Sequence, residues 1–80
     1  MKKDNILEQF SDEDFLFADG FDDAIIGIDG VSRRVIYSVF NCIEILMDTM
    51  SEEEAIEYFE FNTLNSFVGE KTPIWCFDNF

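Results

Sequence analysis

The segment from Ser51 to Val68 constrains the fold most, because it combines a helix start with a wide stripe of apolar residues. Ser51 is a preferred N-cap residue. Glu54 stands three positions later, where its carboxylate can accept the Ser51 backbone N–H and complete a capping box. Gly69 follows Val68 and favours the left-handed conformation that ends many helices. The sequence therefore predicts a helix over residues 52–68.

This helix is predicted to have an apolar face and an acidic face. Spacings of three and four residues place seven side chains on a wide apolar face that should be buried. These side chains are Ile56, Tyr58, Phe59, Phe61, Thr63, Leu64 and Val68. Glu53, Glu57 and Glu60 share the opposite face, and the helix has no Lys or Arg to neutralise them. Such a face is either an ordinary solvated surface or a negative surface that binds a basic partner.

A hairpin of two strands is predicted earlier in the chain. The run AIIGI over residues 24–28 is short, apolar and bounded by acidic and glycine residues, which is typical of a buried strand. Asp29-Gly30 is a strong hairpin signal, and the alternating run over residues 34–39 supplies the returning strand. Gly27 inside the first strand indicates a bulge or the close approach of another backbone.

A second helix is predicted over residues 40–49, so that the two helices form a tight hairpin. Apolar side chains cover most of its circumference, and Met47 is expected to fill space in the core. Asn41, Glu44 and Asp48 share the remaining polar stripe. Glu44 and Asp48 either extend the acidic face of the following helix or face away from it, and the sequence allows both arrangements.

A third strand is predicted over residues 73–77, where Pro73 occupies the permitted first position. The expected fold class is therefore α+β: a small antiparallel or mixed three-stranded sheet with the helical hairpin on one face, in the order (α)ββααβ. Residues 22–80 are expected to form this single domain.

The preceding residues 1–21 are expected to form an acidic N-terminal segment of their own. Ile6, Leu7 and Phe10 supply no more than one apolar edge of a frayed helix. Ser11 is a second N-cap residue, and it predicts a short helix over residues 12–17 that Gly20 ends.

The net charge of −13, from 18 acidic and five basic residues, restricts the possible partners. Phosphates and anionic lipids would be repelled, so neither direct nucleic-acid binding nor membrane binding is expected. The charge averages about one per 400 Å² over the roughly 5,000 Å² that a folded chain of this mass exposes. Duplex DNA is about three to four times denser in charge. Only a clustered acidic patch could therefore imitate DNA.

Neither catalysis nor a metal or cofactor site is expected. The chain has no His, and Cys42 and Cys76 lack both metal-ligand spacing and a nearby base. Acidic residues are dense from Asp12 onward, but Leu16 and Phe17 stand where a calcium loop needs a ligand and a glycine. No apolar leader or membrane-spanning run is visible. The expected location is therefore the cytoplasm, with both thiols reduced.

Three stretches carry a resemblance that covers residues 22–74. They are CIEILM at 42–47, EEAIEYFEFN at 53–62 and VGEKTP at 68–73. Through them the chain resembles a family of small uncharacterised acidic proteins encoded by tailed phages. The resemblance implies a viral setting, and hence the cytoplasm of the host cell, and it brings no activity with it.

Two functions from different classes are consistent with these patterns. The first is a small acidic protein that binds a basic host or viral protein, in one form as a DNA-mimic inhibitor of a nuclease, polymerase or repressor. Its expected partner-binding residues are Glu44, Asp48, Glu53, Glu57 and Glu60. The alternative is a self-associating structural or accessory protein, such as a homodimer, with an aromatic interface. Ten of the 80 residues are Phe, which favours an exposed aromatic patch, a bulky core or both.

Overall fold

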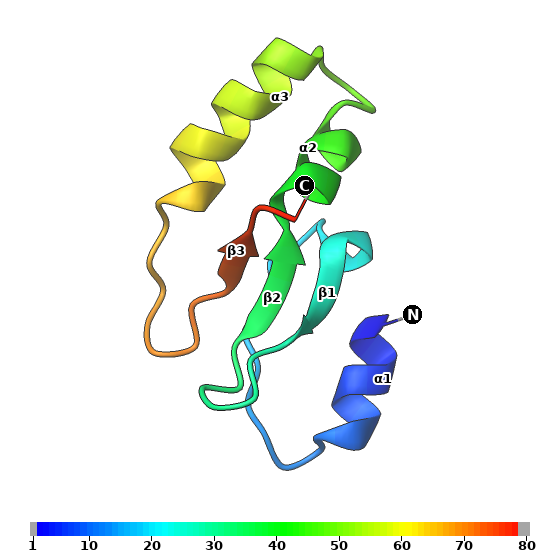
Figure 1. Cartoon of the computed structure of the whole chain (residues 1–80), viewed down its shortest axis with the longest axis vertical. Coiled ribbons are helices and arrows are strands. Elements are labelled where there is room, and N and C mark those ends of the chain that lie inside the picture. The colour runs from blue at the N-terminus through cyan, green and yellow to red at the C-terminus, as the bar shows by residue number, and fades with distance from the viewer. Residues whose placement is uncertain (1, 79–80) are drawn as a thin grey trace.

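A computed structural model of the chain describes residues 2–78 and confirms the α+β class (Figure 1). In chain order its elements are α1 (Lys2–Gln9), the 3-10 turn η1 (Asp22–Ala24), β1 (Ile25–Ile28), β2 (Val35–Ser38), α2 (Val39–Leu46), α3 (Glu52–Phe59), the π-helical turn η2 (Glu60–Leu64) and β3 (Ile74–Cys76). The order of helices and strands is thus αββααβ, as the sequence predicts.

The three strands form one mixed sheet in the order β1-β2-β3. β1 runs antiparallel to β2, whereas β3 runs parallel to β2. A parallel neighbour requires a long return of the chain, and both α2 and α3 lie within that return. The pairing of β1 with β2 is interrupted by a bulge between Ile25 and Gly27, at the glycine that indicated one.

Asp29 organises the turn between β1 and β2. Its Oδ2 accepts the backbone N–H groups of Ser32 (2.7 Å) and Val31 (3.2 Å). The Asp29 backbone N–H donates to the Arg34 carbonyl over 2.8 Å and closes the loop. The hydrogen bonds from Ser32 favour the ionised carboxylate and lower the pKa of Asp29. The hairpin predicted from Asp29-Gly30 is therefore present, with a loop that extends to Arg34.

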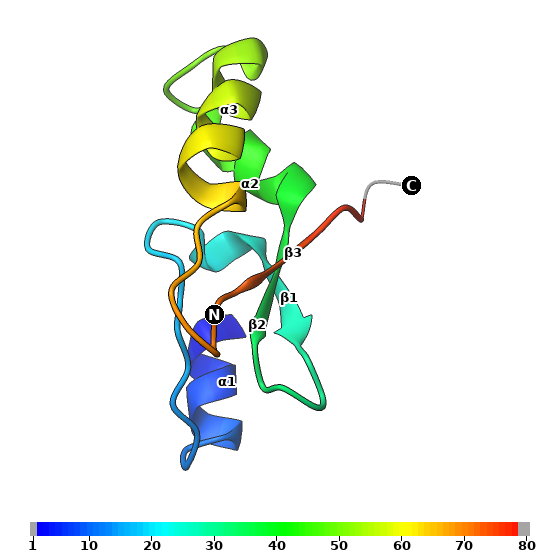
Figure 2. The ribbon, with the colours of Figure 1, turned by 90° about the vertical axis from the view of Figure 1, so that its left-hand side faces the viewer.

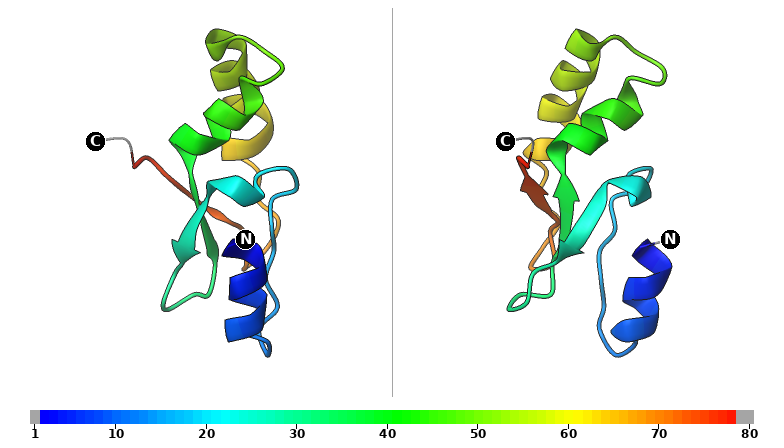
Figure 3. Two further views of the ribbon diagram at one scale, coloured as in Figure 1. Left: turned by 90° about the vertical axis from the view of Figure 1, so that its right-hand side faces the viewer. Right: turned by 45° about the vertical axis from the view of Figure 1, so that its right-hand side comes forward.

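The helices occupy the two ends of the sheet. α2 continues directly from β2 and packs beside α3, whereas α1 lies against β1 near the opposite end (Figure 1). In a side view, α1 and α3 lie toward the same side of the sheet (Figure 2). After α1 the chain runs back along the sheet to the 3-10 turn without forming a further helix or strand (Figure 3).

One face of the sheet carries a core in which several aromatic rings pack together. Ile25, Tyr37 and Trp75 are paired across the three strands, so their side chains share that face. The Phe59 ring meets Trp75 edge-on with centroids 5.5 Å apart, and the Phe21 ring meets Trp75 edge-on at 6.5 Å. Edge-on contact is a favoured arrangement for aromatic rings. Phe59 therefore packs the helical hairpin against the sheet.

The N-terminal segment differs from the prediction. No helix covers residues 12–17, and α1 covers residues 2–9 instead. The segment after α1 is extended, and its side chains alternate: Phe15 and Phe17 pack against the core while Leu16 is exposed. The predicted helix was wrong because this period of two buries both Phe rings on one side, whereas a helix would turn them to different sides.

Helix α3 begins at the predicted capping box. Ser51 Oγ accepts the Glu54 backbone N–H over 3.2 Å, and the Glu54 carboxylate accepts the Ser51 backbone N–H over 3.3 Å. These two bonds satisfy donors that the first turn of a helix otherwise leaves free. The start of α3, and with it the position of its acidic first turn, is therefore fixed locally.

The helical stretch ends at Leu64, four residues before the predicted end at Val68. The Ser66 hydroxyl donates to the carbonyls of Thr63 (2.8 Å) and Asn62 (3.3 Å). Side chains that bond to nearby backbone groups compete with continuation of a helix, and this region is rich in them. Polar side chains therefore end the helix before the glycine that was expected to end it.

The buried face of α3 is narrower than predicted. Ala55 and Phe59 are buried, with Phe59 only 1% exposed, but Phe61 is 80% exposed. Ile56 and Tyr58 also remain substantially exposed. α3 packs mainly against α2, and Phe59 is its chief contact with the sheet, so a narrow stripe is covered. The predicted burial of Ile56, Tyr58 and Phe61 was wrong, and these side chains contribute to the surface instead.

Candidate functional site

The five predicted partner-binding residues lie at one end of the molecule, on and between the two helices of the hairpin (Figure 1). Glu44 belongs to α2, Asp48 follows it, Glu53 and Glu57 belong to α3, and Glu60 begins η2. All five side chains are exposed. The structure therefore leaves each of them accessible to a partner.

The hairpin end carries carboxylates without any basic residue. Between Val39 and Leu64 the sequence has seven acidic residues and neither Lys nor Arg. The seven are Glu44, Asp48, Glu52, Glu53, Glu54, Glu57 and Glu60. Like charges this close on a helix repel one another by a few tenths of a kcal/mol per pair. A cationic partner would relieve that repulsion.

Three basic side chains form ion pairs with carboxylates outside the hairpin. Lys3 lies 3.9 Å from an Asp22 oxygen. Glu13 lies between Arg33 (3.8 Å) and Lys71 (3.5 Å), so one carboxylate links the N-terminal segment to two turns. Among the side chains of residues 3–78, no ion pair involves a carboxylate of α2, α3 or η2. The acidic hairpin therefore has no neutralising partner within the described chain.

An apolar groove separates α2 from α3 and has acidic edges. It has a volume of about 440 Å³, and its apolar lining consists of Phe40, Ile43 and Met47 from α2 and Ile56 from α3. Met47 is 40% exposed, so the prediction that it fills the core was wrong. An unbranched thioether side chain adapts its shape readily to a bound surface. The lining of the groove is therefore suited to contact an apolar side chain.

Glu44 and Glu52 are the two acidic residues that line this groove, one from each helix. Residues Phe40, Ile43, Glu44 and Met47 are spaced as one face of α2, and that face turns toward α3. Glu44 therefore lies beside Glu52 at the groove, on the side of α2 that faces α3. The sequence reasoning missed Glu52, although its spacing of four from Ile56 places both on one side of α3.

A second, shallower depression follows the other side of α3. It is lined by Glu54, Glu57, Tyr58, Phe61 and Asn62. Glu57 is thus brought beside two exposed aromatic rings, while Asp48, Glu53 and Glu60 line neither hollow. The acidic surface therefore continues around α3 from the groove to an aromatic edge, which the sequence placed in the core.

Hydrogen bonds hold the start of α2 in place. Ser38 Oγ accepts the Asn41 backbone N–H over 3.1 Å and caps the helix. The same hydroxyl donates to Asp78 Oδ1 over 2.6 Å, which ties the helix start to the chain just after β3. With the capping box of α3, these bonds position both walls of the groove.

Two titratable groups of the interior, Cys42 and Tyr37, have raised pKa values. Burial, with a smaller effect of Asp78, raises the pKa of the Cys42 thiol to about 12. The thiol is therefore protonated at neutral pH, whereas a nucleophile needs the thiolate. Burial likewise raises the pKa of Tyr37, whose hydroxyl oxygen accepts the Ala18 backbone N–H over 2.7 Å. Both groups act as parts of the core.

The described residues contain neither a cluster suited to hold a metal ion nor a helix suited to span a membrane. Within residues 2–78 no group of three or more Cys, Asp or Glu side chains is placed to hold a metal ion. No helix in that part of the chain has the length and apolar character needed to cross a bilayer.

Comparisons with known proteins found no relative of this chain. The chain was compared with protein-family models, with curated protein sequences and with solved structures, and none of them matches it.

Proposed function

We propose that this protein is a binding protein whose α2–α3 hairpin engages a basic protein. The observation that carries the proposal is the concentration of seven carboxylates, without a Lys or Arg, on the hairpin, where two of them, Glu44 and Glu52, line an apolar groove. The resemblance to small phage proteins would place the partner among host or phage proteins. Direct binding to nucleic acid is disfavoured, because the same carboxylates repel phosphates.

The carboxylates and the groove would contribute differently to binding. An exposed ion pair contributes about 0–1 kcal/mol and mainly directs and accelerates the encounter. Burial of an apolar side chain in a pocket near the centre of an interface contributes more and slows dissociation. The expected partner surface is therefore cationic and presents an apolar side chain that enters the groove between Glu44 and Glu52.

A DNA-mimic inhibitor is one form of this function. The average charge density of the chain is well below that of DNA, and seven carboxylates at one end raise it locally. A nuclease, polymerase or repressor has a basic surface that such an end could occupy. The apolar groove would then supply contacts that a phosphate backbone does not offer.

Charge reversal provides the test. Glu53→Lys, Glu57→Lys and Glu60→Lys are combined in one variant. The matched control reverses the exposed residues Glu8, Asp12 and Asp14 at the other end of the molecule, so that both variants have the same net charge. Proteins captured from a host lysate are compared at about 50 mM and about 500 mM salt, where screening of exposed charges differs strongly. A partner that the native chain and the control variant capture, and the hairpin variant loses, supports the proposal.

The outcome that would overturn the proposal is equal capture by both charge variants, or capture that does not weaken at high salt. Truncation of the groove lining tests the apolar contribution separately. Met47→Ala combined with Ile56→Ala is expected to weaken binding about tenfold at every salt concentration, because it removes buried contacts and leaves the charges in place.

Self-association remains the second candidate, because exposed aromatic side chains favour it. Phe61 and Phe67 are 80% and 81% exposed, and Val68 next to Phe67 is also exposed. Light scattering at about 100 µM distinguishes a 9.3 kDa monomer from a dimer of twice that mass. A dimer that Phe61→Ser and Phe67→Ser convert to a monomer would assign the aromatic surface to self-association. A strict monomer would remove this candidate.

A further inference from the structure

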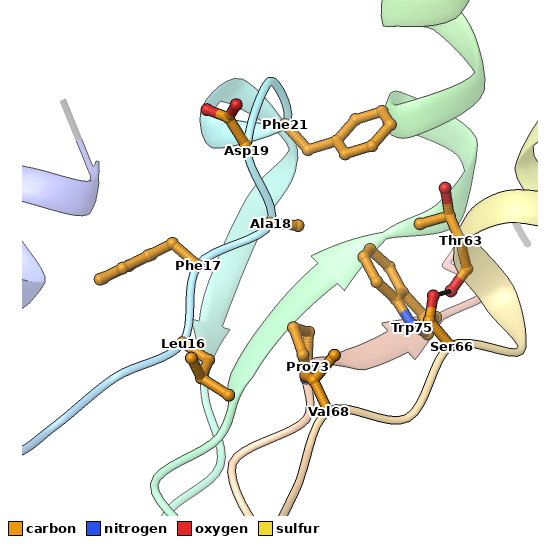
Figure 4. Close-up of a pocket in the computed structure, with 10 residues that line it drawn as sticks. All are labelled: Leu16, Phe17, Ala18, Asp19, Phe21, Thr63, Ser66, Val68, Pro73 and Trp75. Carbon is orange, nitrogen blue, oxygen red and sulfur yellow. Dashed lines mark hydrogen bonds between the residues drawn. The ribbon is translucent and has the colours of Figure 1, made fainter.

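A crevice that none of the hairpin carboxylates lines lies between the N-terminal segment and the chain around β3 (Figure 4). Its volume is about 330 Å³, which is within the range of pockets that accept small molecules. Two stretches distant in sequence form its walls, residues 16–21 on one side and residues 63–75 on the other. Trp75 lies between them and packs on the core below.

The chemistry of the lining restricts the ligand. Most of the lining is apolar, from side chains such as Leu16, Phe17, Val68 and Pro73. Asp19 is the single charged residue among those that line the crevice, and no Lys or Arg lines it. An anionic ligand would find no counter-charge and one repulsive carboxylate. The crevice therefore suits a neutral, apolar molecule.

The indole N–H of Trp75 adds a polar requirement. Its nitrogen is buried and has no hydrogen-bond partner within the described residues. A buried donor without an acceptor is unfavourable, and buried Trp side chains usually find a partner. The nearby Ser66 hydroxyl donates its hydrogen to the carbonyl of Thr63 instead (2.8 Å). A ligand that supplies an acceptor would relieve this unsatisfied donor.

We propose that the crevice binds a neutral, ring-sized apolar molecule whose carbonyl-type oxygen accepts the hydrogen bond of Trp75 Nε1. The indole nitrogen is covered in this structure, so this hydrogen bond requires a local rearrangement, for which we propose a shift of the adjoining loop over residues 65–73. That loop contains no helix or strand and carries the exposed side chains of Phe67 and Val68. This site is independent of the proposed protein-binding function, because it uses none of the hairpin carboxylates.

The neutral dye prodan is a suitable probe, because it is a naphthalene that carries a propionyl carbonyl. Dimethylaminonaphthalene has the same fused ring without the carbonyl and serves as the matched control ligand. Trp75 is the one tryptophan of the chain, so quenching of its emission reports binding near it. Prodan is expected to bind at one site and about three- to tenfold more tightly than the control ligand, the range that one hydrogen bond supplies.

Three variants locate the dye, with prodan emission as the readout. Ala18→Leu fills the crevice and should abolish binding. Trp75→Phe keeps an aromatic ring without the N–H and should bring the affinity for prodan down to that for the control ligand. Phe77→Ala removes an exposed ring that does not line the crevice and should leave binding unchanged. Circular dichroism checks that each variant is folded.

A second measurement uses the native chain alone and does not depend on how the variants fold. The single indole N–H gives one side-chain cross peak in a proton–nitrogen correlation spectrum. Prodan should move its proton resonance downfield, as a new hydrogen bond does, and the control ligand should not. An indole resonance that responds equally to both ligands, or that does not respond to saturating prodan, would overturn the proposal. So would unchanged prodan binding by a folded Ala18→Leu variant.

Discussion

Replacement of Phe59 tests whether one side chain holds the helical hairpin on the sheet. Its ring is buried and makes edge-to-face contacts with the rings of Phe21 and Trp75. Truncation of a buried Phe to Ala costs about 3–5 kcal/mol, because burial is lost and a cavity remains. A domain of this size has a total stability of roughly 4–12 kcal/mol at about 0.05–0.15 kcal/mol per residue. Phe59→Ala is therefore expected to leave the domain close to unfolding.

Urea unfolding followed by Trp75 emission and circular dichroism measures the effect. Phe59→Leu retains part of the buried volume and is expected to cost about 1–2 kcal/mol, which keeps the transition measurable. Phe61→Ala is the matched control on the same helical stretch, two residues further along. Its ring is 80% exposed, so its removal should change the free energy of unfolding by less than about 0.5 kcal/mol. Equal losses for Phe59→Ala and Phe61→Ala would refute the reasoning.

Three further predictions concern local structure and pH. Ser51→Ala removes the cap of α3 and should lower the free energy of unfolding by about 1 kcal/mol in urea titrations. Gly69 has φ = 116°, so Gly69→Ala should cost about 1–3 kcal/mol, whereas Gly30→Ala, at a glycine without positive φ, should be close to neutral. The pKa of Cys42 is raised from 9.0 to about 12 in the fold, so its contribution to stability is complete below pH 9 and is lost as pH rises toward 12. The free energy of unfolding measured across that range should fall by up to about 1.4 kcal/mol per pH unit, and Cys42→Ala should reduce this fall. The pKa of Tyr37 is also raised, so this residue adds a fall of the same sign.

The sequence predicted those features in which all interacting groups lie within a few residues of one another. The capping box needs Ser51 and Glu54 alone, and the hairpin loop needs Asp29 and the amides that follow it. The fold class followed from the order of such local signals. The helical stretch ends before Gly69 predicts, because polar side chains such as Ser66 bond to backbone carbonyls and compete with the helix.

Which side chains are buried, and which residues line the groove, depends on how the helices and the sheet pack, and the sequence pattern does not give that packing. Phe59 and Phe61 have the same side chain, and the position of the sheet relative to α3 decides which of them is covered. Glu44 was recognised as acidic, but its place beside the groove depends on how α2 lies against α3. Glu52 was read as part of a helix start, so its second position beside the groove was missed.

The separation of charge along the molecule has a consequence for its encounters in solution. The chain measures 39 × 25 × 24 Å, and the hairpin without basic residues occupies one end of the long axis (Figure 1). Such a particle has an electric dipole and turns in the field of a cationic surface, so that it arrives hairpin first. Two copies that approach by these ends repel each other. This repulsion disfavours pairing of copies hairpin end to hairpin end.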